Sequence, residues 1–125
     1  MSERLFYVYR QGLETELGLG ITERQSSETT YIASIYLGGG RSRSEVVWYY
    51  VDHIMSRTNP GDKTVIVTND MTMRSKRRFN YPDIEFVVVA SNRSTLREAK
   101  MMANDSLKRK STITEELKIG GIMNG

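Results

Sequence analysis

The sequence contains no cysteine, which excludes disulfide bonds, thiolate metal sites and a cysteine nucleophile. Chains without disulfides suit a reducing compartment, and residues 1–10 lack the apolar run of a signal peptide, so we expect a cytoplasmic protein. No stretch approaches the roughly 18 apolar residues of a membrane span, so we expect no membrane partner. The one histidine, His53, falls inside a predicted helix, where we interpret it as a structural or surface residue.

The charge of the chain is unevenly distributed. At 125 residues the chain is long enough for one domain with a hydrophobic core, and its net charge is +3. Residues 1–70 contain seven basic and nine acidic residues, whereas residues 71–110 contain ten basic and four acidic ones. A basic block of this kind favours either a polyanionic partner or a solvated, solubilising surface.

Apolar patterning predicts three strands, a helix, a strand, a basic connection, a strand and a helix. The expected strands are residues 4–10, 17–24, 29–37, 63–70 and 84–90, and the expected helices are residues 43–55 and 95–110. The short turns between the first three strands predict antiparallel pairing. Ser42 and Glu45 have the spacing of a capping box at the start of the first helix. We expect residues 1–110 to form the domain and residues 111–125 to be a tail, with one helical turn near Thr112.

The second predicted strand alternates apolar residues with glycine in Leu17-Gly-Leu-Gly-Ile21. One face of this strand therefore carries almost no side chains. Glycines at such positions indicate the close approach of a helix or another backbone.

The stretch Lys63–Asp70 is the most informative part of the chain. Its residues 65–68 are all β-branched, which predicts a short strand buried on both faces. The strand ends in Asn69-Asp70, and open α/β sheets place their functional sites at the carboxyl ends of central parallel strands. The basic segment Arg74-Ser-Lys-Arg-Arg78 follows a few residues later. This arrangement favours metal or phosphate chemistry around Asp70.

Three short sequences stand at defined places in this order of elements. Val67-Thr-Asn-Asp-Met71 ends the fourth strand, Arg43-Ser-Glu-Val-Val47 opens the first helix, and Met102-Ala-Asn-Asp-Ser-Leu107 lies in the last helix. With them, the chain resembles the ribonuclease H-like family over about residues 4–110. The resemblance implies an α/β fold with a mixed five-stranded sheet in the order 3-2-1-4-5, in which the second strand is antiparallel to the rest.

The resemblance also implies a catalytic metal site. Glu45, Asp70 and Asp105 match three of the four family carboxylates, which would hold Mg²⁺ or Mn²⁺ for phosphodiester hydrolysis. At the fourth place, on the first strand, the family has Asp-Gly, whereas this chain has Gln11-Gly12 after Arg10. A neutral amide oxygen does not replace an anionic ligand, and an arginine repels metal ions. The fourth ligand would then have to come from elsewhere, such as Glu14 or Glu16.

Basic residues around the predicted site favour contacts with a nucleic-acid backbone. The Gly38-Gly-Gly40 turn leads into a helix N-terminus, a geometry that can bind phosphate. It matches neither the dinucleotide nor the P-loop fingerprint, so we expect no organic cofactor. The candidate nucleic-acid-binding residues are Arg41, Arg43, Arg74, Lys76, Arg77, Arg78 and Arg93.

Three hypotheses about function remain open at this point. The first is a nucleic-acid-binding domain for RNA–DNA hybrid or duplex whose hydrolytic activity is lost or weakened. The second is an active Mg²⁺- or Mn²⁺-dependent ribonuclease H-type endonuclease with a rearranged carboxylate site. The third is a protein-interaction scaffold or homodimer that uses the aromatic residues Trp48, Tyr49 and Tyr50 of the first helix. The fold alone does not choose among them.

Overall fold

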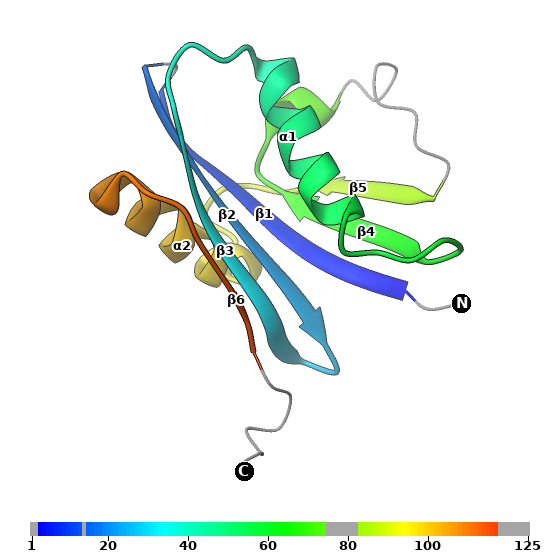
Figure 1. The fold of residues 1–125 in the computed structure, drawn as a ribbon. Coiled ribbons are helices and arrows are strands. Elements are labelled where there is room, and N and C mark those ends of the chain that lie inside the picture. Colours follow the sequence, from blue (N-terminus) through cyan, green and yellow to red (C-terminus); the bar gives the residue numbers. More distant parts are fainter. Residues whose placement is uncertain (1–2, 14, 75–82, 118–125) are drawn as a thin grey trace.

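The computed structural model describes residues 3–13, 15–74 and 83–117, which form one mixed sheet with a helix on each face (Figure 1). The strands are β1 (Glu3–Leu13), β2 (Glu16–Gln25), β3 (Glu28–Gly38), β4 (Lys63–Thr68), β5 (Ile84–Val88) and β6 (Ile113–Glu116). The helices are α1 (Arg43–Met55) and α2 (Arg97–Arg109), and the short 3-10 turns are η1 (Met71–Arg74) and η3 (Ser94–Leu96). No helix in these ranges is long and apolar enough to cross a membrane.

The order of the strands in the sheet is β5-β4-β1-β2-β3-β6. β1 is parallel to β4 and β4 is parallel to β5, whereas β2 is antiparallel to both β1 and β3. This confirms the predicted order 3-2-1-4-5 and the reversed second strand. Because β1, β3, β4 and β5 run in the same direction, the segments that follow them lie at one end of the sheet, called here the C-terminal end.

A sixth strand corrects the expectation for the tail. The helical turn predicted near Thr112 is wrong, because residues 113–116 form β6 and pair antiparallel with β3. All four side chains of β6 are exposed, so the strand gives no apolar periodicity from which it could be predicted. The sheet therefore includes residues beyond position 110, the predicted end of the domain.

The face of the sheet under α1 carries the larger hydrophobic core. Phe6 and Val8 of β1 and Ile21 of β2 point toward α1 and are fully buried. On the helix, the fully buried side chains include Tyr50 and Ile54. Full burial of one large apolar side chain stabilises the fold by about 1.5–3 kcal/mol. The helix begins at the predicted capping box, in which Ser42 and Glu45 bond each other's main chain.

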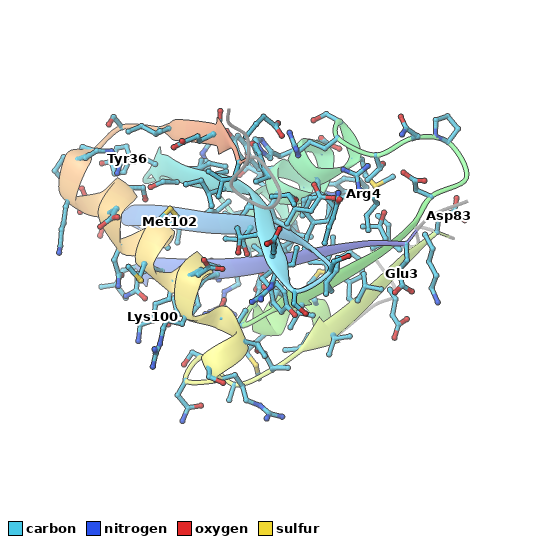
Figure 2. The ribbon with its side chains drawn as sticks, turned by 90° about the horizontal axis from the view of Figure 1, so that it is seen from below. Glu3, Arg4, Tyr36, Asp83, Lys100 and Met102 are labelled. Atoms are coloured by element: carbon cyan, nitrogen blue, oxygen red, sulfur yellow. The ribbon has the colours of Figure 1, made fainter. Side chains whose placement is uncertain are left out.

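The two glycines of β2 let α2 lie directly on the sheet. A Cβ atom at Gly20 would be 1.7 Å from the Ala99 carbonyl oxygen, and one at Gly18 would be 2.3 Å from the Ser106 hydroxyl oxygen. Figure 2 shows α2 crossing this face, with Lys100 and Met102 on it. The close approach predicted from the Leu-Gly-Leu-Gly pattern is confirmed.

β4 is more completely covered on one face than on the other. Thr64, Ile66 and Thr68 are buried, whereas Val65 and Val67 are only partly buried. The prediction of a strand buried on both faces therefore holds fully for the face under α1 and in part for the opposite face. β4 lies between β1 and β5, so the end of this strand is flanked by two other parallel strands.

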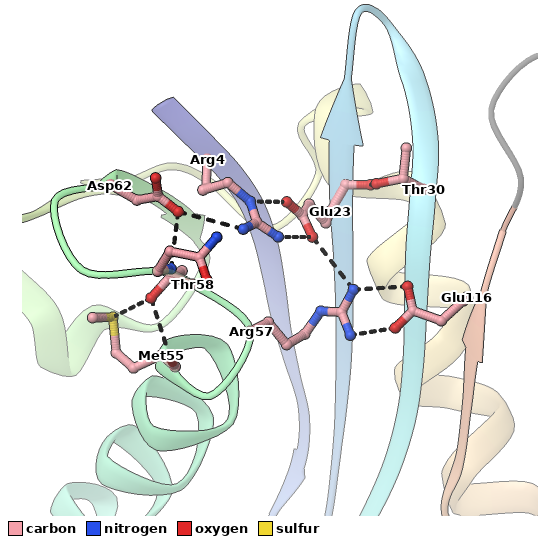
Figure 3. A network of polar contacts seen from close by, with 9 residues as sticks. Arg4, Glu23, Thr30, Met55, Arg57, Thr58, Asp62 and Glu116 are labelled. Atoms are coloured by element: carbon pink, nitrogen blue, oxygen red, sulfur yellow. Dashed lines mark hydrogen bonds and ion pairs between the residues drawn. The ribbon is translucent and has the colours of Figure 1, made fainter. Parts of the chain in front are cut away.

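A network of charged side chains lies at the opposite end of the sheet (Figure 3). Glu23 of β2 has no exposed surface, and its carboxylate accepts hydrogen bonds from Arg4, one of them 3.0 Å long. Arg57 lies 3.6 Å from the same carboxylate and also pairs with Glu116 of β6. Arg4 reaches Asp62 at 3.5 Å. The cluster thus ties β1, β2, β6 and the end of α1 together, far along the sheet from Asp70.

Candidate functional site

Asp70 lies at the C-terminal end of the sheet, where the sequence predicted a site. It follows β4 and is 2% exposed. Its Oδ1 accepts a hydrogen bond of 3.0 Å from the Thr72 N–H, and its Oδ2 accepts one of 3.1 Å from the Tyr50 hydroxyl. Its own N–H donates to the Thr68 hydroxyl at 3.1 Å. Both oxygens of the carboxylate are therefore already bound to protein donors.

The charged neighbour of Asp70 on the first strand is Arg10. The Arg10 Nη1 atom lies 3.9 Å from Asp70 Oδ1. Side chains alternate along a strand, so Arg10 shares the α1 face with Phe6 and Val8, whereas Gln11 falls on the opposite face. The position beside the strand-tip carboxylate thus carries a fixed positive charge.

Asn69 fixes the main chain of Arg10. The regular pairing of β1 with β4 ends at Val8 and Thr68. Beyond it, the Arg10 N–H donates to Asn69 Oδ1 at 2.8 Å, and Asn69 Nδ2 donates to the Arg10 carbonyl at 3.0 Å. The side-chain amide therefore continues the hydrogen bonding between the two strands and positions Arg10 next to Asp70.

Tyr50 supplies a buried hydroxyl from α1. The side chain has no exposed surface. Burial, and then the nearby Asp70 carboxylate, raise the pKa of the Tyr50 hydroxyl far above its ordinary value. The hydroxyl keeps its proton at neutral pH and serves as a hydrogen-bond donor to Asp70.

Two cavities adjoin this group of residues. One has a volume of about 230 Å³ and the other about 420 Å³. Arg10, Gly12 and Arg43 line both cavities. The smaller cavity is also lined by Asn69, Asp70, Met71 and Thr72. The larger cavity is also lined by Leu13 and Thr15. In the described part of the chain, the Arg10 Nε and Thr72 Oγ1 atoms are buried without a hydrogen-bond partner. The smaller cavity is therefore lined by two arginines and by the Asp70 carboxylate that one of them pairs with.

Four of the predicted basic residues lie at the C-terminal end of the sheet. Arg41 and Arg43 follow β3, and Arg93 follows β5; all three are exposed. The Arg41 guanidinium lies 5.6 Å from the Tyr49 ring centre and donates to the Leu37 carbonyl at 3.4 Å. Arg74 ends η1 at the same end of the sheet. The Arg74 side chain and the remaining candidates, Lys76, Arg77 and Arg78, lie outside the described residues.

Glu45 has a structural role in the capping box of α1. Its Oε1 accepts a 2.8 Å hydrogen bond from the Ser42 N–H, and its own N–H donates to the Ser42 hydroxyl at 3.2 Å. The hydrogen bond from the Ser42 main chain lowers the pKa of the Glu45 carboxyl. Since its carboxylate is exposed and engaged at the helix start, we assign Glu45 to capping rather than to the predicted metal site.

Asp105 is not brought to Asp70 either. It lies in the third turn of α2, which packs on the face of the sheet opposite to α1 and Tyr50. Glu16, one of the alternative ligands, accepts a 2.9 Å hydrogen bond from the Tyr36 hydroxyl and pairs with Lys110. The other alternative, Glu14, lies outside the described residues.

These placements decide how well the chain fits a divalent metal. Within residues 3–13, 15–74 and 83–117, no three His, Cys, Asp or Glu side chains are grouped so that they could hold a metal ion. Asp70 faces Arg10 in place of a second carboxylate. The predicted cluster of Glu45, Asp70 and Asp105 is therefore not assembled, and the residues present do not fit a two-metal centre.

Arg10, Tyr50, Asn69 and Thr72 build the site, although none of them was predicted as a residue of a site around Asp70. Arg10 stood out in the sequence only as an obstacle to metal binding beside Gln11. Tyr50 is part of the apolar stripe of α1, so its pattern indicated a core residue. Only the tertiary structure brings them together: the register of β1 with β4 places Arg10 beside Asp70, and α1 brings the Tyr50 hydroxyl to it.

The aromatic band and the histidine of α1 have different environments. Trp48 is 42% exposed, whereas Tyr49 packs partly against the core and Tyr50 is fully buried. His53 lies with its Nε2 atom 2.7 Å from the Tyr31 hydroxyl oxygen. This contact supports the structural interpretation of His53. The residue lies near the C-terminal end of α1, away from Asp70.

Comparison with known proteins identifies the fold of the chain. No protein-family model matches the chain, and no curated protein matches its sequence. Its structure is similar to that of LC11 ribonuclease H1, isolated from compost by a metagenomic approach, with a TM-score of 0.66 and 10% identity over 88% of this chain and 99% of the other. It is also similar to the same enzyme in complex with an RNA/DNA hybrid, with a TM-score of 0.61 and 12% identity over 86% and 98%. The chain has a ribonuclease H-like fold.

Proposed function

We propose that this chain, with its ribonuclease H-like fold, is a nucleic-acid-binding domain whose metal-dependent phosphodiesterase activity is lost or weakened. The observation that carries the proposal is the pairing of Arg10 with Asp70 at the C-terminal end of the sheet. Arg41, Arg43 and Arg93 surround the same end. The similar LC11 enzyme is known in complex with an RNA/DNA hybrid, which supports hybrid or duplex as the partner.

Two-metal hydrolysis requires several carboxylates with oxygens that are available to the metal ions. Here both oxygens of Asp70 accept hydrogen bonds from Tyr50 and Thr72. The Arg10 guanidinium adds a positive charge where a cation would have to approach. The same arrangement that disfavours a metal ion favours an anion.

Arginines on exposed loops suit contacts with a phosphate backbone better than recognition of bases. Such contacts give affinity that depends little on sequence. The logarithm of the binding constant then falls linearly with the logarithm of the salt concentration, with a slope of about −0.9 for each phosphate contact on a duplex. Strong salt dependence is therefore the expected property of this site.

Fluorescence anisotropy with a labelled RNA–DNA hybrid, and with RNA and DNA duplexes of the same sequence, tests the proposal. We expect binding in EDTA that weakens linearly on the log–log salt plot and no cleavage in Mg²⁺ or Mn²⁺. Arg93→Gln should weaken binding, whereas Lys63→Gln is the matched control, because Lys63 is exposed at the opposite end of the sheet.

Two results would contradict the proposal. The binding function is wrong if no nucleic acid is retained at low salt. The loss of catalysis is wrong if Mg²⁺ or Mn²⁺ produces cleavage that disappears in Asp70→Asn. In that case the alternative, an active endonuclease with a rearranged carboxylate site, is correct.

A further inference from the structure

The edge strand β6 is attached to the sheet with little contribution from side-chain burial. It forms four residue pairs with β3, and all four of its side chains are exposed. Its one large apolar side chain, Ile113, is 49% exposed. Just beyond the strand, the Leu117 N–H donates to the Thr30 carbonyl at 2.8 Å. Since little apolar surface is buried, the attachment of β6 depends on main-chain hydrogen bonds and on polar contacts of its side chains.

Arg57, which follows α1, makes an ion pair that joins β6 to the rest of the sheet (Figure 3). Its Nη2 atom donates to Glu116 Oε1 at 2.9 Å, and its Nη1 atom pairs with the other oxygen of the same carboxylate. The guanidinium carbon lies 3.5 Å from the centre of the Tyr31 ring, and Nη2 lies 3.6 Å from the buried Glu23 carboxylate. A two-point pair between arginine and a carboxylate requires a defined placement of the guanidinium. Displacement of Arg57 therefore weakens the attachment of β6.

His53 contacts the tyrosine on which Arg57 lies. The centres of the His53 and Tyr31 rings are 5.9 Å apart, and His53 Nε2 is 2.7 Å from the Tyr31 hydroxyl oxygen. The Tyr31 hydroxyl is also hydrogen-bonded to Thr114 of β6. Tyr31 thus connects His53 with Arg57 and with β6. Besides His53, the titratable and charged groups packed together here are Tyr31 of β3, Arg57 after α1, Glu116 of β6 and Glu23 of β2.

We infer that His53 is a proton-sensitive switch for the pairing of β6 with β3. A histidine that gains a proton places a second positive charge close to the Arg57 guanidinium. Because like charges repel, Arg57 moves from its place on Tyr31 and loses its two-point pair with Glu116. Opening of β6 then frees the main-chain groups of β3 that pair with it. The switch does not depend on nucleic-acid binding, so it goes beyond the proposed function.

The protonation of His53 agrees with this coupling. Burial, and then the charge of Arg57, lower the pKa of His53 below its ordinary value of 6.5. By linkage, a contact that disfavours the proton is disfavoured by the proton to the same extent. The attachment of β6 is therefore strongest above pH 6.5 and weakens as the pH falls from 6.5 toward the lowered pKa.

Amide hydrogen exchange of the full-length protein, followed by NMR at about pH 7.5 and about pH 5.2, tests the switch. Protection factors are compared, because they correct for the intrinsic pH dependence of exchange. We expect the protection factor of the Leu117 amide to fall about tenfold, whereas that of Ile66, in a strand paired on both sides, falls less. Glu116 stays charged at the lower pH, since the hydrogen bond with Arg57 holds its pKa below 4.5.

His53→Gln is the variant that removes the switch. His53 is the one histidine of the sequence, and glutamine can still form a hydrogen bond with the Tyr31 hydroxyl. The fall in Leu117 protection should disappear in this variant. Glu115→Gln is the matched control, because Glu115 is exposed on β6, and it should retain the wild-type fall.

A second measurement does not depend on how well His53→Gln folds. The double variant Thr114→Pro and Glu115→Pro removes two main-chain donors from β6 and should abolish its pairing with β3. Both residues are exposed, so the rest of the sheet should keep its fold. An NMR titration of the His53 ring should then give a pKa closer to 6.5 than in the wild type.

Each part of the test can overturn the inference. It is wrong if the protection of Leu117 in the wild type does not depend on pH, or if its fall persists in His53→Gln. An equal fall at Leu117 and Ile66 also overturns it, because acid would then destabilise the whole sheet rather than β6. An unchanged His53 pKa in the double-proline variant shows that the histidine and β6 are not coupled.

Discussion

The side-chain amide of Asn69 forms two hydrogen bonds with the main chain of Arg10, one with its N–H and one with its carbonyl group. Asn69 and Arg10 lie just beyond the last regular pair of β4 and β1, Thr68 and Val8. The amide thus takes the place of a further pair of residues in the parallel ladder. The amide therefore extends the alignment of β1 and β4 beyond their last regular pair. It fixes the position of the Arg10 backbone, from which the side chain reaches toward Asp70.

Replacement of Asn69 by alanine should therefore affect both stability and binding. We expect Asn69→Ala to lower the free energy of unfolding by about 1–3 kcal/mol, because partly buried groups of Arg10 lose their partner. Urea denaturation measures this change. Asn92→Ala in the exposed loop before η3 is the control and should change stability by less than about 0.5 kcal/mol. Equal urea midpoints for the two variants would show that the Asn69 hydrogen bonds to the Arg10 main chain do not stabilise the fold.

Tyr50→Phe removes the hydroxyl that donates to Asp70 Oδ2 and preserves the aromatic packing of α1. Asp70 is buried, so the carboxylate loses a donor that water cannot readily replace. We expect a loss of about 1–3 kcal/mol of unfolding free energy. Tyr49→Phe, the adjacent substitution, is the control, because Tyr49 is only partly buried. An unchanged denaturation midpoint for Tyr50→Phe would show that the hydrogen bond contributes nothing to stability.

Gly20→Ala tests the contact of α2 with the sheet. The new Cβ would lie 1.7 Å from the Ala99 carbonyl oxygen, which is main chain and cannot rotate away. The helix must move off β2, and we expect destabilisation of about 3 kcal/mol or more, measured by thermal or urea unfolding. The control is Gly39→Ala, an exposed glycine whose φ is not positive. Wild-type stability of Gly20→Ala would mean that α2 does not pack as described.

His53 makes stability depend on pH near neutrality. Burial, and then the charge of Arg57, lower the pKa of His53 in the folded protein below its ordinary value of 6.5. As the pH falls below 6.5, the unfolded chain takes up a proton that the folded chain does not, so the stability present above pH 6.5 decreases. His53→Gln should flatten the slope of unfolding free energy between about pH 7 and pH 5. An identical slope in the variant would contradict the assignment.

The pairing of β6 with β3 should weaken at acidic pH. The hydrogen bond with Arg57 lowers the pKa of Glu116 below its ordinary value of 4.5. The contribution of this carboxylate is therefore complete above pH 4.5 and is lost as the pH falls through the lowered pKa. Glu116→Gln should accelerate hydrogen exchange at neutral pH for the Leu117 amide, which bonds the Thr30 carbonyl at 2.8 Å. Glu115→Gln, the neighbouring exposed substitution, should leave this exchange rate unchanged.

The sequence by itself determined the features that depend on neighbouring residues. The order of strands and helices, the capping box of Ser42 and Glu45, and the approach of α2 to Gly18 and Gly20 all follow from short-range patterns of side-chain size and polarity. The place of Asp70 was also predictable, because a strand that ends in an acid carries it to the C-terminal end of a parallel sheet.

Only the tertiary structure decided what surrounds Asp70. The pleat of β1 and its register with β4 place Arg10 rather than Gln11 against the carboxylate, and a shift of one residue would reverse this choice. Local patterns also could not show that Asp105 lies on the helix that packs against the opposite face of the sheet. The strand β6 was missed for the same reason: its side chains are exposed, and its place depends on backbone pairing with a strand distant in the sequence.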